Sequence, residues 1–314
     1  MTSLQVSPQQ AAAELLRRRR ARESLAGFAN AIDVPGRPLK EEDAELDWLF
    51  QPVETTLAAH HLLLLRNLDD LVNPAHPLRN MMVFMPPGSA KSTYGSVVCP
   101  ACAMGKYPGL KVIMAGHASD IARKQSRKVR AIVRQPKFSG LWAGGKIVQG
   151  NESVEHWSLE NGSEYMAGGI LSGMTGNRAG LLVIDDPVKG REDADSPTIQ
   201  VKTINAYDDD LKTRLVPMAS TLIIQTRWSQ LDLSGQILPD DWNGQSGLIR
   251  CKDGQEWLVL CLPAVASRAD DPLGRKIGEP LWPEWFTGDH FAKFKANKRT
   301  WTALFQQVPT PDDG

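Results

Sequence analysis

Long apolar runs are absent from the sequence. None of its 314 residues belongs to a run that approaches the ~18 apolar residues needed to span a bilayer, and no apolar signal-peptide core begins the chain. We therefore expect no membrane association and a cytoplasmic location. Net charge is absent too, because 36 basic side chains match 36 acidic ones. No global basic field favours nucleic acid, so any such contact must come from local patches.

Cysteine is scarce as well, with four residues in the chain. Cys99 and Cys102 form the sequence C-P-A-C, whereas Cys251 and Cys261 are remote and poorly spaced for zinc. The C-x-x-C lies within an expected helix, not at the strand-to-helix turn that a thioredoxin-like motif uses. We therefore favour structural packing over redox or metal chemistry for this pair.

Apolar segments with the periods of strands and helices alternate along most of the chain. Short continuous apolar runs predict buried strands at 81–85, 111–116, 181–186 and 220–226. Helical patterns occur at 55–72, 118–135, 196–215 and 229–238, and near the N-terminus around the basic run Arg17–Arg20. This run is interpreted as a solvated helix face rather than a nucleic-acid contact. The alternation predicts an α/β fold with a mostly parallel central sheet flanked by helices.

A deviant phosphate-loop motif follows the first predicted strand in "MPPGSAKST". The usual pattern is G-x-x-x-x-G-K-[ST]; Lys91 and Ser92 match it, while Ala90 and Met85 replace the two glycines. Strand, turn and helix start come in the order that a phosphate site needs, and the helix N-terminus favours an anion. Ala90 is compatible with the loop if its φ is negative. The residues expected to contact a nucleotide are Pro87, Gly88, Ser89, Ala90, Lys91, Ser92 and Thr93. An ordinary exposed loop is the alternative.

Two carboxylates end the strand in "LLVIDDP", as in a Walker B strand. Asp185 would hold Mg²⁺ together with Ser92, and Asp186 could orient or deprotonate an attacking water. A further strand, "STLIIQTRW", ends in Thr226, a polar group able to sense a γ-phosphate. The alternatives are an Asp-Asp-Pro turn and an ordinary strand-to-loop junction. Together the motifs predict an ATP and Mg²⁺ site where Lys91 and Asp185 converge at the tips of two neighbouring strands.

The segments "PPGSAKST", "LLVIDDPVKGREDADSP" and "TRWSQLDLSGQIL" resemble the large terminase subunit of tailed bacteriophages. The resemblance covers roughly residues 45–310 and agrees in order and spacing. It implies a P-loop NTPase of the ASCE type, in which ATP hydrolysis drives double-stranded viral DNA into a prohead. It also implies that Thr226 couples hydrolysis to movement. Asp186 stands where many relatives carry a catalytic glutamate, and Glu192 is a weaker candidate.

The resemblance further implies an arginine finger supplied by a neighbouring subunit. Arg178, just before the acidic strand, is the candidate, with Arg127, Arg214 and Arg227 as rivals. The family implies a homo-oligomeric ring, five by analogy, with the portal protein and the small terminase subunit as partners in the host cytoplasm.

The resemblance also divides the chain into domains. We expect an N-terminal helical segment and linker at 1–50, an ATPase core at 51–250 and a small lid subdomain at 251–314. Gln51 is a tentative adenine contact. Because the chain ends at residue 314, we expect no nuclease domain and no DNA cleavage. The alternatives are a helicase-like DNA translocase, a P-loop small-molecule kinase and a non-catalytic DNA-binding protein.

Overall fold

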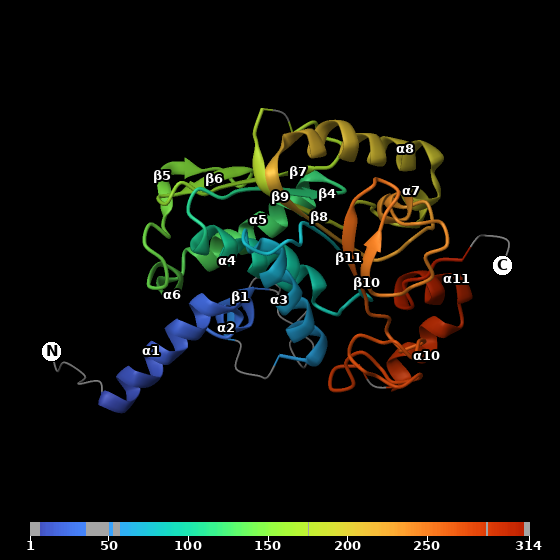
Figure 1. The fold of residues 1–314 in the computed structure, drawn as a ribbon, viewed down its shortest axis with the longest axis horizontal. Coiled ribbons are helices and arrows are strands. Elements are labelled where there is room, and N and C mark those ends of the chain that lie inside the picture. The colour runs from blue at the N-terminus through green and yellow to red at the C-terminus, as the bar shows by residue number, and fades with distance from the viewer. Residues whose placement is uncertain (1–6, 36–49, 53–56, 175, 287, 311–314) are drawn as a thin grey trace.

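A computed structural model describes residues 7–35, 50–52, 57–174, 176–286 and 288–310 of the chain (Figure 1). The predicted linker at 36–49 and the side chain of Gln51 lie outside the described residues. Among the described helices, none combines the length and the apolar character that crossing a bilayer requires.

A nine-stranded sheet forms the centre of the molecule, in the order β10-β11-β3-β9-β8-β4-β7-β6-β5. The strands from β11 to β7 run parallel, and β10, β6 and β5 join the two edges in antiparallel pairs. Their bounds are β3 (Asn80–Phe84), β4 (Lys111–Gly116), β5 (Ile147–Glu152), β6 (His156–Leu159), β7 (Glu164–Gly169), β8 (Ala179–Asp185), β9 (Leu215–Gln225), β10 (Gly247–Arg250) and β11 (Glu256–Cys261). The predicted α/β class and mostly parallel sheet are confirmed.

Helices cover both faces of this sheet (Figure 1). On one face lie α3 (Ala59–Val72), η2 (Thr93–Val98) with α4 (Cys99–Lys106), and α5 (Ser119–Val133). On the other lie α8 (Pro197–Asn205) with the π-helical η3 (Ala206–Leu211), and α9 (Leu233–Ile237). The remaining helical segments are α1 (Pro8–Glu23), α2 (Leu25–Ala29), α6 (Pro136–Ser139), α7 (Arg191–Asp195), η4 (Lys212–Arg214), α10 (Gly288–Lys295), α11 (Lys298–Thr300) and η5 (Trp301–Phe305).

Side chains of the central strands point alternately into two cores, one on each face of the sheet. Val83 and Ile224 face the core under α3, α4 and α5, whereas Met82, Phe84 and Ile223 face the opposite core. Successive side chains of a strand point to opposite faces, so a strand buried on both sides must be apolar throughout. This explains why the central strands appear in the sequence as continuous apolar runs rather than as alternating ones.

The helix after β3 contains a π-helical segment. The backbone N–H of Cys99 donates to the Tyr94 carbonyl, five residues back, and Pro100 follows directly. A proline inside a helix has no N–H to donate and its ring collides with the preceding turn, which the wider π turn accommodates. Cys99 and Cys102 are free and buried in the core, as the packing interpretation predicted.

The N-terminal segment is partly built into the core. Phe28, Ile32 and Val34 are buried with the side chains of α3 and α5, and β1 (Asp33–Pro35) pairs with β2 (Phe50–Pro52). Most of the basic run on α1 has partners on the same helix, because Arg17 and Arg18 pair with Glu14 and Arg19 pairs with Glu23. The described part of 1–50 thus packs on the sheet domain rather than forming a separate unit.

The C-terminal region departs from the sheet after β11. The predicted boundary at 250/251 falls inside the β10–β11 hairpin, and β11 pairs in parallel with β3, so the sheet extends to Cys261. Beyond it, Phe286, Phe291 and Phe305 form a small aromatic cluster of their own, while Leu262 and Leu281 belong to the core under α3. The described residues of 262–310 are called the C-terminal cluster below.

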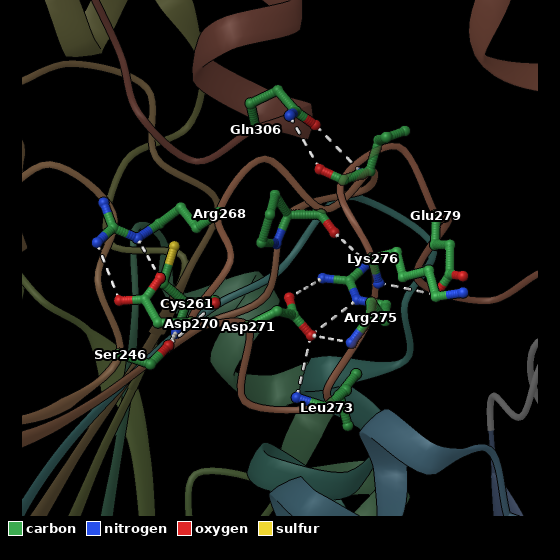
Figure 2. Close-up of polar contacts among 12 residues, drawn as sticks. Ser246, Cys261, Arg268, Asp270, Asp271, Leu273, Arg275, Lys276, Glu279 and Gln306 are labelled. Atoms are coloured by element: carbon green, nitrogen blue, oxygen red, sulfur yellow. Dashed lines mark hydrogen bonds and ion pairs between the residues drawn. The ribbon is translucent and has the colours of Figure 1, made fainter.

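A buried ion pair fixes the first part of the C-terminal cluster. Figure 2 shows Arg275 facing Asp271, while Arg268 and Asp270 pair separately. The shortest nitrogen–oxygen distance between Arg275 and Asp271 is 2.7 Å. The side chains of Arg275 and Asp271 are 8% and 3% exposed, and Arg275 also donates to the Pro263 carbonyl. The pair therefore holds an otherwise irregular segment without helix or strand.

Arg275→Ala should destabilise the protein by about 3–5 kcal/mol, because it leaves the Asp271 carboxylate buried and unpaired. Arg268→Ala is the matched control: its partner Asp270 is 58% exposed, so the expected loss is about 0–1 kcal/mol. Urea unfolding of both variants measures the difference. Equal losses would show that burial does not distinguish the two pairs.

Candidate functional site

Polar side chains gather at the edge of the sheet where the parallel strands end. Lys91 follows β3, Thr226 follows β9, and Asp185 is the last residue of β8. The carboxyl ends of parallel strands form the usual ligand site of an open α/β sheet. The predicted order of the strands is corrected here, because β9 lies between β3 and β8. The two strands are therefore not neighbours, and Thr226 stands between their tips.

The loop after β3 has two residues in the left-handed region. Gly88 has a φ of +79° and Ala90 a φ of +62°. The expectation that Ala90 fits this loop through a negative φ is therefore wrong. The alanine adopts the left-handed conformation that the usual glycine adopts freely. Such a conformation costs an L-residue roughly 1–2 kcal/mol. The buried Ser89 hydroxyl has no hydrogen-bond partner among the described residues.

Aromatic and imidazole rings support this loop from outside. The Nε2 atoms of His60 and His61, in the first turn of α3, lie 3.2 and 3.1 Å from the Ser89 carbonyl oxygen. A carbonyl can only accept, so each ring carries its proton on Nε2. Burial lowers the pKa of His60 to about 4, which keeps this ring neutral. Trp282 of the C-terminal cluster contacts both imidazoles, with ring centroids 5.1 and 4.6 Å away.

The ring of Phe286 lies directly over the loop. A Cβ atom built on Gly88 would lie 3.0 Å from the edge of this ring. Gly88 therefore serves two purposes, because its φ is positive and its neighbour leaves little room for a side chain. The C-terminal cluster thus contacts the loop at Gly88 and, through the two histidines, at Ser89.

The Lys91 ammonium group is buried and has one side-chain partner in the described structure. Its Nζ donates to the Thr226 Oγ1 at 2.8 Å, and the two residues are each 6% exposed. A buried ammonium without a carboxylate partner is costly. The arrangement leaves donor capacity on Nζ, since an ammonium carries three protons.

Both carboxylate oxygens of Asp185 accept hydrogen bonds. The Ser92 hydroxyl donates to Oδ1 at 2.9 Å, and the Gln125 amide donates to Oδ2 at 3.0 Å. Asp185 is 2% exposed. Burial and the nearby Asp186 raise the pKa of Asp185 to about 7, and the Ser92 hydroxyl and Lys91 oppose that shift. A cation beside this carboxyl group would favour its ionised form.

Asp186 lies in a strained backbone conformation. Its φ is +44°, its carboxylate Oδ1 accepts the backbone N–H of Thr226 at 3.0 Å, and its carbonyl accepts the N–H of His117 at 3.2 Å. Strained residues of this kind persist only where surrounding contacts hold them, and they cluster at functional sites.

The donor set fits a magnesium ion that also binds phosphate. Ser92 and Asp185 supply oxygen atoms side by side, which Mg²⁺ prefers. Among the described residues there is no group of three or more His, Cys, Asp and Glu able to hold a metal by itself. Mg²⁺ is commonly held by one or two protein oxygens with substrate phosphates. Lys91, the Ser89 hydroxyl and the start of the helix at Ser92 suit the phosphates.

The structure separates two predicted residues from this group. Arg178 is exposed and precedes β8, whereas Asp185 ends that strand. Seven residues of strand span roughly 20 Å, so Arg178 lies at the opposite edge of the sheet. Glu192 is exposed in the first turn of α7. Neither residue has a described contact with Lys91 or Asp185.

The rival arginines differ sharply in their surroundings. Arg227 is 2% exposed; its Nε lies 2.8 Å from Asp232, and its guanidinium lies over the rings of Phe84 and Trp242. These contacts give Arg227 a structural role in its own subunit. Arg127 is exposed on α5 and Arg214 is half-buried at the end of η4.

Sequence reasoning missed the groups that support the site. Gln125, His60 and His61 all belong to helices that were predicted, but nothing in a helical pattern shows which polar side chain reaches a strand tip. The adjacent histidines at the start of α3 were the one available signal. Phe286 could not be assigned, because its contact with Gly88 joins segments almost two hundred residues apart in the chain.

Solved structures share this fold. The crystal structure of the HK97 bacteriophage large terminase aligns with a TM-score of 0.56 and 12% identity, covering 91% of this chain and 54% of that chain. The chain thus spans about half the length of that protein. The ATPase domain of the Thermus phage P74-26 large terminase aligns with TM-scores of 0.53, as a mutant, and 0.50 in a second structure, both at 12% identity. These alignments cover 82% of this chain and 95% and 94% of those chains.

No family model and no curated protein sequence matches the chain. The likeness is therefore one of fold, and at this level it bears out the resemblance noted in the sequence. The chain shares the fold of these phage large-terminase structures.

Ala90→Gly should leave stability unchanged or raise it by up to about 1 kcal/mol, because it removes left-handed strain while adding freedom to the unfolded chain. Ala131→Gly, in the interior of α5, should instead cost about 1 kcal/mol. Thermal unfolding of the two variants tests this contrast. A loss at Ala90 as large as that at Ala131 would contradict the left-handed assignment.

Proposed function

We propose that this chain is the ATPase portion of a phage large terminase, which uses ATP hydrolysis to translocate double-stranded DNA into a prohead. The single observation that carries the proposal is the convergence of Lys91, Ser92, Asp185 and Thr226 at one edge of a parallel sheet. An ammonium, a hydroxyl and a carboxylate around a helix start are the groups that a magnesium–nucleotide complex needs.

In the proposed complex, the loop 87–93 binds the phosphates of ATP. Its backbone and the N-terminus of the following helix offer N–H groups to the anion, and Lys91 contacts the β- and γ-phosphates. Ser92 and Asp185 would hold Mg²⁺, which when bound would neutralise negative charge on the phosphates. The ionised form of Asp185 is the one that would bind the metal.

Hydrolysis requires a water molecule aligned with the γ-phosphate. We assign the orientation, or the deprotonation, of this water to Asp186. One oxygen of its carboxylate accepts the Thr226 N–H, which leaves the other oxygen for the water. Water adds to the γ-phosphorus, the bond to the β-phosphate oxygen breaks, and ADP and inorganic phosphate leave. Glu192 remains the weaker candidate for this step, because it is exposed in α7.

Thr226 is proposed to report the state of the nucleotide. Lys91 donates to the Thr226 hydroxyl, so a γ-phosphate at the ammonium would compete with the threonine. The neighbouring Arg227 N–H donates to Gln307 of the C-terminal cluster, and Phe286 of the same cluster covers Gly88. A change at the tip of β9 therefore has a short route to residues 262–310, which lie within the proposed lid at 251–314.

The proposed assembly is a ring of identical subunits, five by analogy, acting with portal protein and small terminase subunit in the host cytoplasm. Arg178 lies too far from Asp185 to serve its own site, so any finger role is in trans. The basic residues of α5 and nearby loops are the proposed contacts with DNA phosphates. Such contacts are independent of sequence and weaken with salt.

Lys91→Ala should abolish ATP hydrolysis, because the ammonium that contacts the phosphates is lost. Lys111→Ala is the matched control: this lysine begins β4, at the opposite edge of the sheet, and forms a surface pair with Glu164. Release of inorganic phosphate is measured with and without duplex DNA. Wild-type turnover in Lys91→Ala would overturn the loop assignment, and transfer of phosphate to an added acceptor would favour a kinase.

Asp186→Asn should lower turnover by about 10²–10⁴-fold while nucleotide affinity is retained. Asparagine keeps the oxygen that accepts the Thr226 N–H, and it tolerates a positive φ, so the fold of the turn is preserved. Single-turnover hydrolysis and nucleotide titration separate the two effects. Unchanged turnover here together with a loss in Glu192→Gln would assign the base to Glu192.

A further inference from the structure

Gln125 is the one residue of α5 with a described hydrogen bond to the proposed nucleotide site. Its Nε2 donates to Asp185 Oδ2 at 3.0 Å, on the side opposite the hydrogen bond from Ser92 to Oδ1. The carboxylate is thus held between a hydroxyl of the phosphate loop and an amide of a helix that follows a different strand. No motif in the sequence pointed to this residue.

The position of α5 does not depend on this hydrogen bond. Ser126 donates to the Val154 carbonyl and accepts from the indole N–H of Trp157, and Val129 and Ile132 are buried against the sheet. With the helix fixed by these contacts, the Gln125 amide adds little to the packing of α5. The amide instead constrains the orientation of the Asp185 carboxylate.

The chemistry of an amide suits this task. A lysine or arginine at this place would neutralise the carboxylate and compete with a cation, and an acid would repel it. A neutral amide donates one N–H and leaves the negative charge intact. Groups behind a metal ligand that fix its orientation in this way contribute substantially to metal affinity.

We propose that Gln125 is a positioning residue for the Asp185 carboxylate, which it holds by Oδ2 so that Oδ1 and the Ser92 hydroxyl face the cation of a magnesium–nucleotide complex. This inference rests on the proposed function. It predicts that loss of the amide weakens binding of the cation in the nucleotide complex, and leaves binding of the nucleotide without metal unchanged.

The test measures ADP affinity of the full chain by calorimetry, in EDTA and across a magnesium titration. Binding of Mn²⁺ in the ADP complex is followed by electron paramagnetic resonance. Gln125→Leu should weaken cation binding roughly tenfold to a hundredfold, with ADP affinity in EDTA unchanged. Gln125→Asn, whose amide is one methylene too short to reach Oδ2, should weaken it as well.

Gln135→Leu is the matched control. This glutamine follows α5, and its amide exchanges two hydrogen bonds with the backbone of Asp33, far from Asp185 in the fold. The Gln135→Leu variant should show the same dependence of ADP affinity on magnesium as the wild-type chain. An equal loss of ADP affinity in EDTA and in magnesium, or a wild-type cation dependence in both Gln125 variants, would overturn the positioning role. A wild-type chain that binds no nucleotide in either condition would remove the proposed function, and this inference with it.

Discussion

The carboxyl group of Asp185 is almost fully buried, and a buried carboxyl group must find hydrogen-bond partners for both of its oxygens. Two separate parts of the chain supply these partners to the carboxylate at the end of β8: the loop after β3 supplies Ser92, and α5 supplies Gln125. The two hydrogen bonds fix the orientation of the carboxylate between two helices that other contacts already hold in place. Removing any of these partners leaves an unpaired polar group inside the protein.

Backbone strain occurs on both sides of this carboxylate. Ala90 and Asp186 are non-glycine residues with positive φ, one in the phosphate loop and one directly after Asp185. Each conformation is held by tertiary contacts: the loop by His60 and His61 at the Ser89 carbonyl, and the turn by the Thr226 N–H. Strain that packing sustains in this way is often associated with ligand sites, because it presents groups that a relaxed turn would not present.

Much of the fold could be predicted from local sequence. The apolar runs at 81–85, 111–116 and 181–186 correspond to β3, β4 and β8, because a doubly covered parallel strand must be apolar throughout. The insertion of β9 between β3 and β8 could not be predicted, since strand order depends on non-local pairing that no short segment encodes. The positive φ of Ala90 was missed for the opposite reason: alanine rarely adopts it, so the letter alone argues against the conformation. The distant position of Arg178 was available from the sequence, because a residue that precedes a strand lies at the other end from one that finishes it.

The π-helical segment after the loop that follows β3 changes the direction in which later side chains of the helix point relative to earlier ones. An α-helix advances about 100° per residue, so the direction in which Ser92 points would normally dictate the direction in which Cys99 and Cys102 point. One extra residue in the turn between them decouples these two directions. The same helix can therefore aim its first turn at the strand tips and its later turns at the apolar interior. Deleting one residue of the π turn would restore the α-helical advance, and with it the coupling between the two directions.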